Sequence, residues 1–284
     1  DGPGIRTTVF FKGCQLKCIW CHNPESQNFK KEILYNKNKC TLCGNCVKTC
    51  QNNAIEINNN FLNMNMDKCT FCGDCTLYCI NSARQIAGKE YTVDEVMEEV
   101  LKDRVFYKNS KGGATLSGGE PLIYAEFVEE LLMKLKKENI HTAVDTCGCV
   151  DFKVLERVSR YTDLFLYDLK TMDDEKHILY TGVSNINIID NLIKLSEIHN
   201  NINLRLPLIE GINADEDNIL GILRLIKKTN IKKINLLPYH DIAMHKYEKL
   251  GREYYEYMKR PADEKLEEFK GIFEKEGYKV KIGG

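Results

Sequence analysis

The chain has 284 residues with 40 basic and 41 acidic side chains, and its net charge of −1 gives no electrostatic footprint for nucleic acid. Hydrophobic residues make up 43% and charged residues 29%, the balance of a globular protein with one large domain or two smaller ones. No apolar run is as long as the roughly 18 residues of a membrane span, and no signal peptide is visible. Thirteen cysteines without an export signal therefore indicate metal binding in a reducing cytoplasm rather than a disulfide framework.

The first motif is a cysteine loop that follows a short strand. A Gly-Pro-Gly turn precedes residues 7–11, which are β-branched and aromatic and predict a strand. Cys14, Cys18 and Cys21 follow in the spacing C-x3-C-x2-C. Three thiolates can hold three irons of a cubane [4Fe-4S] cluster and leave the fourth iron open to a bound molecule. A zinc loop or a disulfide-linked turn is the alternative.

Residues 13–24, GCQLKCIWCHNP, resemble the cluster loop of radical S-adenosylmethionine (SAM) enzymes, specifically the activating enzymes of glycyl radical enzymes. The resemblance implies a catalytic cluster on these three cysteines, whose open iron chelates the amino and carboxylate groups of SAM. It also implies that Asp1, in the DGPGIR stretch, contacts the backbone of a substrate peptide. For Asp1 the alternative is a turn-capping carboxylate. Because the chain starts on this motif without an initiator methionine, we expect that a short native N-terminus is missing.

The cysteine-rich region at residues 29–88 contains an internal duplication. The spacing C-x2-C-x2-C-x3-C starts at Cys40 and recurs from Cys69, 29 residues later. It matches bacterial ferredoxins, in which the last cysteine of each run ligates the other cluster. We therefore predict one [4Fe-4S] cluster on Cys40, Cys43, Cys46 and Cys79, and a second on Cys69, Cys72, Cys75 and Cys50. Two zinc sites are the alternative. Gln51 and Ile80 stand where ferredoxins usually have proline after the last cysteine, which should alter the local turn.

After Gly88 strands and helices alternate. Thr92 and Glu95 form a capping-box pattern at the start of a helix. Strands are then predicted near 114–116, 141–144, 164–169, 202–208 and 234–237, and helices near 123–138, 151–160, 186–199, 216–229 and 263–276. This order predicts βαβ units and a parallel sheet. With the first strand there are six units, too few for a closed eight-stranded barrel, and they match the partial barrel of the resembled family.

The expected fold class is therefore α/β, an open partial (β/α)6 TIM-like barrel with an inserted ferredoxin-like domain that carries two [4Fe-4S] clusters. The barrel is assigned to residues 1–28 and 89–284 and the insert to residues 29–88.

A glycine-rich motif and three charged residues follow predicted strands, at the edge where such folds place their sites. The resemblance implies that Gly118, Gly119 and Glu120 bind the SAM amino group; a glycine turn before a helix-starting proline is the alternative. It also implies a monovalent cation near Asp145 and Asp168. Lys170 would lie near SAM, and the alternative is a buried ion pair among Asp145, Asp168 and Lys170.

Two further residues lie on later strands. Arg205 is a charge within an apolar run, so it should point into the barrel and need an anionic partner, either the SAM carboxylate, as the resemblance implies, or a structural salt bridge. His240 would lie against the nucleoside part of SAM. We interpret Cys147 and Cys149 as small core residues outside the site, and His245, Lys246 and Tyr247 as solvated loop residues.

The resemblance thus predicts a cytoplasmic, anaerobic activating enzyme with three [4Fe-4S] clusters, SAM and a monovalent cation. It would cleave SAM reductively to a 5′-deoxyadenosyl radical that abstracts a hydrogen atom from a glycine Cα of a partner glycyl radical enzyme. Flavodoxin or ferredoxin would supply the electron, and the chain would act as a monomer without nucleic-acid or membrane partners. The rivals are a radical SAM enzyme acting on a small molecule, a pure iron-sulfur electron-transfer protein and a structural zinc protein.

Overall fold

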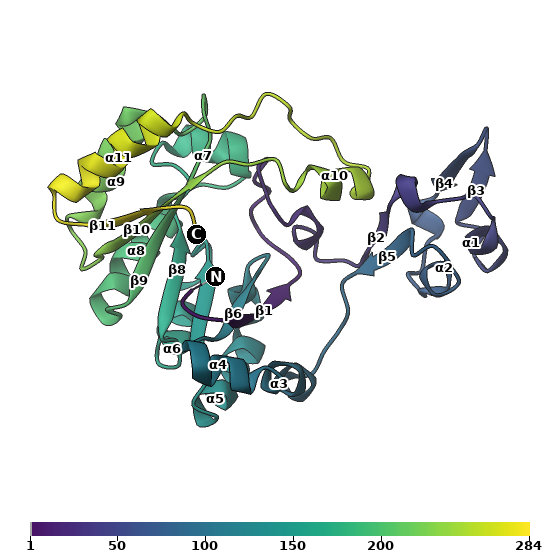
Figure 1. The fold of residues 1–284 in the computed structure, drawn as a ribbon, viewed down its shortest axis with the longest axis horizontal. Coiled ribbons are helices and arrows are strands. Elements are labelled where there is room, and N and C mark those ends of the chain that lie inside the picture. The colour runs from purple at the N-terminus through teal and green to yellow at the C-terminus, as the bar shows by residue number, and fades with distance from the viewer. Residues whose placement is uncertain (1) are drawn as a thin grey trace.

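The computed structural model describes residues 2–284, so the prediction for Asp1 lies outside the described residues. Its main element is a parallel sheet of seven strands, with neighbours in the order β1-β6-β7-β8-β9-β10-β11 (Figure 1). The strands are β1 (Arg6–Phe11), β6 (Gly113–Gly118), β7 (His141–Thr146), β8 (Leu164–Asp168), β9 (Ile202–Leu208), β10 (Lys233–Pro238) and β11 (Lys279–Ile282). Every pair of neighbours is parallel, as the βαβ pattern predicts.

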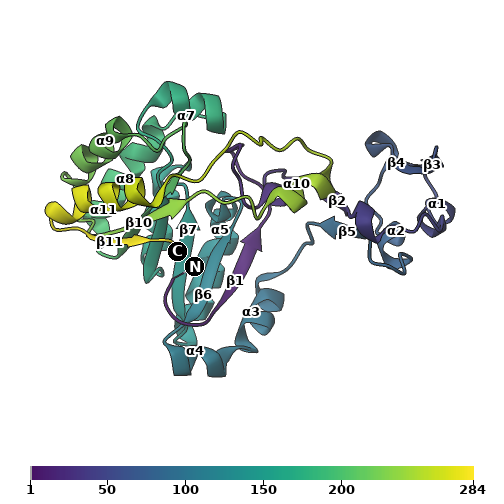
Figure 2. The ribbon, with the colours of Figure 1, turned by 45° about the horizontal axis from the view of Figure 1, so that its top comes forward.

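Helices connect the strands and cover the outer face of the sheet (Figures 1 and 2). They are α3 (Val93–Leu101), α4 (Arg104–Ser110), α5 (Ala125–Lys137), α6 (Phe152–Ser159), α7 (Asp174–Thr181), α8 (Ile186–Ile198), α9 (Glu216–Ile226) and α11 (Asp263–Lys275), whereas α10 (Met244–Leu250) lies beside the inserted region. The capping box at α3 is confirmed: Thr92 accepts from the Glu95 backbone, and the Glu95 carboxylate accepts from the Thr92 backbone. Within residues 2–284, no helix combines the length and apolarity needed to cross a membrane.

One strand of the sheet is not among those predicted from the sequence. The prediction has six strands, whereas β11 pairs with β10 and forms a seventh at the edge. The strands β6, β7 and β8 are buried over most of their length because both of their faces are covered, by helices outside and by side chains inside, whereas buried positions alternate in β9. In β8 the first four residues are all buried.

The inserted region forms two small antiparallel pairs and two short helices. β2 (Glu32–Tyr35) pairs with β5 (Arg84–Ala87), and β3 (Ile55–Asn58) pairs with β4 (Phe61–Met64). The helices α1 (Asn45–Lys48) and α2 (Asp74–Leu77) both begin after a left-handed glycine. Leu42 and Phe71, at equivalent positions of the duplication, have φ of 56° and 55°. The duplicated sequence therefore folds into two equivalent cysteine loops.

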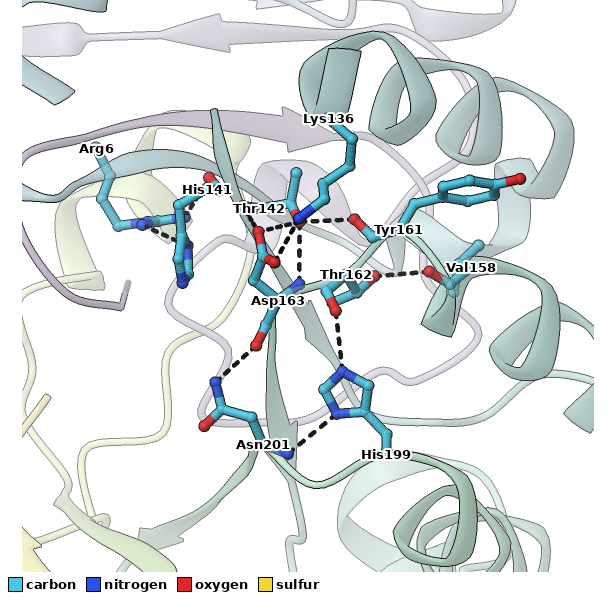
Figure 3. A network of polar contacts seen from close by, with 10 residues as sticks. All are labelled: Arg6, Lys136, His141, Thr142, Val158, Tyr161, Thr162, Asp163, His199 and Asn201. Atoms are coloured by element: carbon cyan, nitrogen blue, oxygen red, sulfur yellow. Dashed lines mark hydrogen bonds and ion pairs between the residues drawn. The ribbon is translucent and has the colours of Figure 1, made fainter. Parts of the chain in front are cut away.

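At the amino ends of the strands a polar network joins several elements (Figure 3). The Asp163 carboxylate accepts hydrogen bonds from the Thr142 backbone (2.9 Å) and from Lys136 (2.6 Å). Arg6 donates through Nη2 to the carbonyls of Ala114 (2.5 Å) and His141 (3.2 Å), and so ties β1 to β6 and β7. This network lies at the end of the sheet opposite the predicted site, the end whose residues serve stability in folds of this kind.

Replacing Asp163 with asparagine is expected to lower the melting temperature by a few degrees, because the charged hydrogen bond with Lys136 contributes about 1 kcal/mol. Burial would raise the pKa of Asp163, but the bonds from Lys136 and Thr142 lower it below its usual range. Its contribution is thus present above the unfolded pKa and is lost as the pH falls through the lower folded pKa. Anaerobic thermal melts at pH 7 test this expectation, and an unchanged melting temperature would contradict it.

Candidate active site

The carboxyl ends of the strands surround a cavity of about 650 Å³. Its lining includes the three cysteines of the first motif and most residues for which a SAM contact is predicted. These are Cys14, Cys18, Cys21, Gly118, Gly119, Asp145, Asp168, Lys170, Arg205 and His240. The volume is in the range of pockets that enclose a ligand of SAM size. The structure therefore brings together residues that are up to 226 positions apart in the sequence.

The cysteine loop lies directly against the glycine motif. Glu120 donates its backbone N–H to the carbonyl of Gly13 (2.8 Å), and Gly119 donates to the carbonyl of Phe11 (2.8 Å). A Cβ at Gly119 would lie 2.1 Å from the Gly13 oxygen, and Gly118 has a φ of 107°. Both positions thus require glycine, because the backbone of this motif packs on the backbone of β1 and the cysteine loop.

Burial shapes the chemistry of the cysteine loop. It raises the pKa of Cys18 to about 12 and that of Cys21 to about 11. Both thiols are therefore protonated without metal, and cluster binding must displace their protons. Three thiols on one loop at the mouth of a large cavity fit a cluster with one open iron. Trp20 is buried and packs in the same hydrophobic cluster as Cys18.

Glu120 differs from the rest of its motif because it does not line the cavity. Its fully buried carboxylate accepts hydrogen bonds from the Thr146 hydroxyl (2.8 Å), the Cys147 backbone (2.9 Å) and the Leu122 backbone (3.2 Å). The side chain thus joins the loop after β6 to the end of β7. Cys147 is buried, as predicted for a core residue, but it also lines the cavity.

A charged quartet, Asp145, Asp168, Lys170 and Arg205, forms one wall of the cavity. Arg205 contacts Asp145 (3.1 Å) and Asp168 (2.6 Å), and Lys170 contacts Asp168 (2.5 Å). Each side chain is at most 16% exposed. Burial would raise the pKa of Asp168, but Arg205 and Lys170 hold it at about 2. The ion pairs named as the alternative are thus present, and they lie where a ligand with both charges would bind.

Two histidines stack at the cavity lining. The rings of His22 and His240 have centroids 4.1 Å apart and an angle of 23° between their planes. His240 follows β10, and His22 directly follows the last cysteine of the loop. The stack therefore joins the cysteine loop to the end of the sixth strand, beside the cavity.

The segment around α10 holds the cysteine loop from outside, a role that the sequence did not reveal. Lys246 contacts the His22 carbonyl (3.0 Å) and the carboxylate of Glu25 (2.7 Å). Tyr247 donates its hydroxyl to the Cys21 carbonyl (3.1 Å). The interpretation of Lys246 and Tyr247 as solvated residues is wrong, because both pack on a segment more than 220 residues earlier.

In the insert, each of two further cavities is ringed by four cysteines. The first, which we name cavity 1, is lined by Cys40, Cys43, Cys46 and Cys79. The second, cavity 2, is lined by Cys50, Cys69, Cys72 and Cys75. These are the two sets predicted from the crossed ferredoxin pattern, and rings of four thiols fit closed [4Fe-4S] clusters. Within residues 2–284, no three His, Cys, Asp or Glu side chains are arranged to bind one metal ion.

Two family profiles match the chain. The profile of the radical SAM superfamily matches residues 66–226, more than half of the chain, and that of the 4Fe-4S dicluster domain matches residues 32–80. The first match leaves out the loop of Cys14, Cys18 and Cys21, whereas alignments with relatives over the whole chain include it. Iron-sulfur clusters and SAM are therefore the cofactors of this protein.

Among curated proteins, the chain is 49% identical to the trans-4-hydroxy-L-proline dehydratase activating enzyme of Clostridioides difficile, over 100% of this chain and 95% of the relative. It is 42% identical to the choline trimethylamine-lyase activating enzyme of Oleidesulfovibrio alaskensis, over 89% and 84% of the two chains. The 4-hydroxyphenylacetate decarboxylase activating enzyme of Clostridioides difficile is 38% identical, over 100% and 92%.

Solved structures agree with the predicted fold. A domain of pyruvate-formate lyase-activating enzyme from Bacteroides vulgatus matches with a TM-score of 0.53 and 34% identity, over 61% of this chain and 99% of that domain. Streptococcus suis SuiB, bound to its precursor peptide SuiA, matches with a TM-score of 0.62 over 99% of this chain and 49% of SuiB. At 13% identity the second likeness shows the fold alone.

These matches confirm the predicted α/β fold and favour the activating-enzyme prediction over the electron-transfer and small-molecule alternatives. The full-length relatives share one activity in their names while their partners differ. The chain is an oxidoreductase that belongs to the glycyl radical enzyme activating enzymes of the radical SAM superfamily.

Proposed function

We propose that the 650 Å³ cavity is where this activating enzyme holds SAM against a cluster carried by Cys14, Cys18 and Cys21. When bound, cluster and SAM supply a 5′-deoxyadenosyl radical by one-electron cleavage of a carbon-sulfur bond, leaving methionine, and this radical takes a hydrogen atom from a glycine Cα of the partner. The observation that supports the proposal is that the cysteine loop and the charged quartet line one cavity.

The residues of the cavity receive separate roles in this proposal. The cations Arg205 and Lys170 face the carboxylate of SAM, and Asp145 and Asp168 face its positive charges. His240, stacked on His22, lies against the nucleoside. The amino group is bound by the segment Gly118–Glu120, in which the backbone of the two glycines that line the cavity supplies the contacts and the buried Glu120 carboxylate fixes the loop. Asp1 contacts the backbone of the substrate peptide.

The insert is proposed to span residues 29–88 between the barrel segments 1–28 and 89–284, and to hold two clusters, which makes three [4Fe-4S] clusters per chain. A monovalent cation is proposed on oxygens of Asp145 and Asp168, which Arg205 and Lys170 already partly neutralise. Flavodoxin or ferredoxin supplies the electron, and the chain acts as a monomer in the cytoplasm.

We further propose that the partner is a trans-4-hydroxy-L-proline dehydratase. The support is the 49% identity to the activating enzyme of that dehydratase, which extends over the whole chain, against 42% and 38% for activating enzymes of other partners. The experiment incubates the reduced, reconstituted chain anaerobically with SAM and each of three partners in turn: the proline dehydratase, the choline lyase and the hydroxyphenylacetate decarboxylase.

The expected result is a glycyl radical signal in electron paramagnetic resonance (EPR), with stoichiometric 5′-deoxyadenosine, on the dehydratase and little on the other two. A stronger signal on the choline lyase or the decarboxylase would reject the partner and keep the activity. No deoxyadenosine with any partner would reject the proposed use of the cavity.

A further inference from the structure

The two cysteine-lined cavities of the insert lie at different distances from the barrel, although the sequence around them is duplicated. Both views show α1 farther from the seven-stranded sheet than α2, with β2 and β5 on the side of the barrel (Figures 1 and 2). Residues of α1 line cavity 1, and residues of α2 line cavity 2.

The pairing of β2 with β5 gives the same order. Glu32 pairs with Ala87 at the end where the chain joins the barrel, and Tyr35 pairs with Arg84 at the far end. Arg84 lines cavity 1, whereas Ile33, one residue from the barrel end, lines cavity 2. Cavity 1 is thus the distal cavity, and cavity 2 lies between it and the catalytic cysteine loop.

Glu32 also anchors the near end of this ladder. Its carboxylate contacts Lys12 (2.8 Å), just before the catalytic loop, and Arg252 (2.6 Å), which also donates to the Pro24 carbonyl (2.8 Å). These contacts connect the insert to the segment that carries the catalytic loop, and so hold cavity 2 in place relative to that loop.

Charge distinguishes the two cavities at equivalent positions. Residues 36–46, around cavity 1, contain two lysines and no acid, a charge of +2, whereas residues 65–75, around cavity 2, contain one lysine and two aspartates, a charge of −1. Lys37 and Lys39 are both exposed. The equivalents of Asn38 and Asn45 are Asp67 and Asp74. The distal cavity is therefore the better electrostatic match for an acidic protein.

An exposed apolar side chain completes the distal rim. Ile80, which stands where ferredoxins usually have proline, lines cavity 1 and is 82% exposed. Its equivalent at cavity 2 is the polar Gln51. Leu77 and Tyr78, just before Cys79, are exposed as well. Apolar contact surrounded by complementary charge is what transient docking of an electron carrier requires.

We propose that the exposed residues Lys37, Lys39 and Ile80, the cavity 1 rim, form the docking surface for an acidic one-electron carrier protein, and that electrons enter the chain there. The proposal rests on the proposed function, because it takes both cavities to hold clusters. The reduced carrier loses one electron, which passes from the cysteines of cavity 1 to those of cavity 2 and then to the catalytic loop. There the same electron cleaves one carbon-sulfur bond of SAM, so the chain returns to its starting oxidation state.

The test compares matched charge reversals in the duplicated loops. Lys39→Glu lies on the rim, and Lys68→Glu is at the equivalent position 29 residues later beside cavity 2. Acidic flavodoxin and acidic 2[4Fe-4S] ferredoxin serve as carriers. Stopped-flow absorbance measures reduction of the reconstituted chain without SAM, and calorimetry measures binding of the oxidised carriers. Iron content and dithionite reduction of each variant show whether its clusters are intact.

At low salt, Lys39→Glu is expected to slow reduction of the chain by the carrier and to weaken binding of the carrier, each about tenfold. Both effects should shrink at high salt. Lys68→Glu should change the reduction rate and the affinity by less than about twofold. Ile80→Gln, which installs the residue found at the equivalent position, should weaken binding without changing its salt dependence. Lys37→Glu, farther from Cys40, repeats the test if Lys39→Glu loses iron.

Equal effects of Lys39→Glu and Lys68→Glu, no effect of Lys39→Glu, or no binding of either carrier would overturn the proposal. If Lys39→Glu instead slows glycyl radical formation when dithionite is the reductant, the rim belongs to the glycyl radical enzyme. Native protein that forms no deoxyadenosine with dithionite would reject the proposed function, whichever surface the carriers use.

Discussion

Cys18→Ala is expected to abolish SAM cleavage and to lower the iron content from about twelve to about eight atoms per chain. Cys18 is a buried cysteine of the catalytic loop and lines the large cavity. With two thiolates left, the loop cannot hold a cubane that keeps one iron open. The eight cysteines around cavities 1 and 2 are untouched, so the EPR signals of their reduced clusters should remain.

Cys149→Ala is the matched control, because Cys149 is a half-buried cysteine that packs near the loop and lies outside all three spacings. It should keep about twelve irons and normal deoxyadenosine formation. SAM cleavage retained in Cys18→Ala would show that the catalytic cluster is held elsewhere. Loss of all iron would instead show that the insert cannot fill its sites without the barrel loop.

Asp168→Asn is expected to weaken SAM binding about a hundredfold, with unchanged iron content. Asp168 is the shared anion of Arg205 and Lys170, and its carboxylate is charged because both cations hold its pKa near 2. Without that charge, Asp145 is the one anion left in the quartet to balance the two buried cations. The excess positive charge then repels the sulfonium and ammonium groups of SAM. Equilibrium binding of SAM to the reconstituted, unreduced protein measures the loss.

The other end of the same strand provides the control for Asp168→Asn. Asp163 precedes β8 and belongs to the network at the amino ends, whereas Asp168 ends β8 at the cavity. Asp163→Asn should lower stability and leave the affinity for SAM unchanged. If both variants bind SAM equally well, the charged quartet is structural and the ligand contacts lie elsewhere in the cavity.

The central strands were predictable because their apolar runs reflect burial on both faces. In β8 the first four residues are all buried, and in β9 buried positions alternate with half-buried ones, and the sequence carries both patterns directly. β11 was not predicted because Lys279 and Lys281 alternate with Val280 and Ile282. A strand at the sheet edge has one face in solvent. Its alternation of charged and apolar residues therefore resembles that of many short surface segments that are not strands.

The sequence predicted which residues gather at the large cavity better than it predicted the direction of their side chains. Spacing indicated both cysteine sets of the insert, because the ligand pattern is local and duplicated. The turn of Glu120 away from the cavity depends on Thr146 and Cys147 of the next strand, and nothing in the GGE motif encodes it. Lys246 and Tyr247 were missed for a related reason, since their partners lie at the opposite end of the chain.

The contacts of Lys246, Tyr247 and Arg252 with residues 21–25 have a consequence for biosynthesis. The catalytic cysteines leave the ribosome more than 220 residues before the segment that holds their loop in place. The crossed cysteines of the insert, by contrast, are complete once Cys79 has been made. The proposed clusters of the insert can therefore form while the chain is still growing, whereas the loop of Cys14, Cys18 and Cys21 is held in place only after Arg252 has been made. Cluster delivery would thus proceed in two stages, with the reactive site filled last.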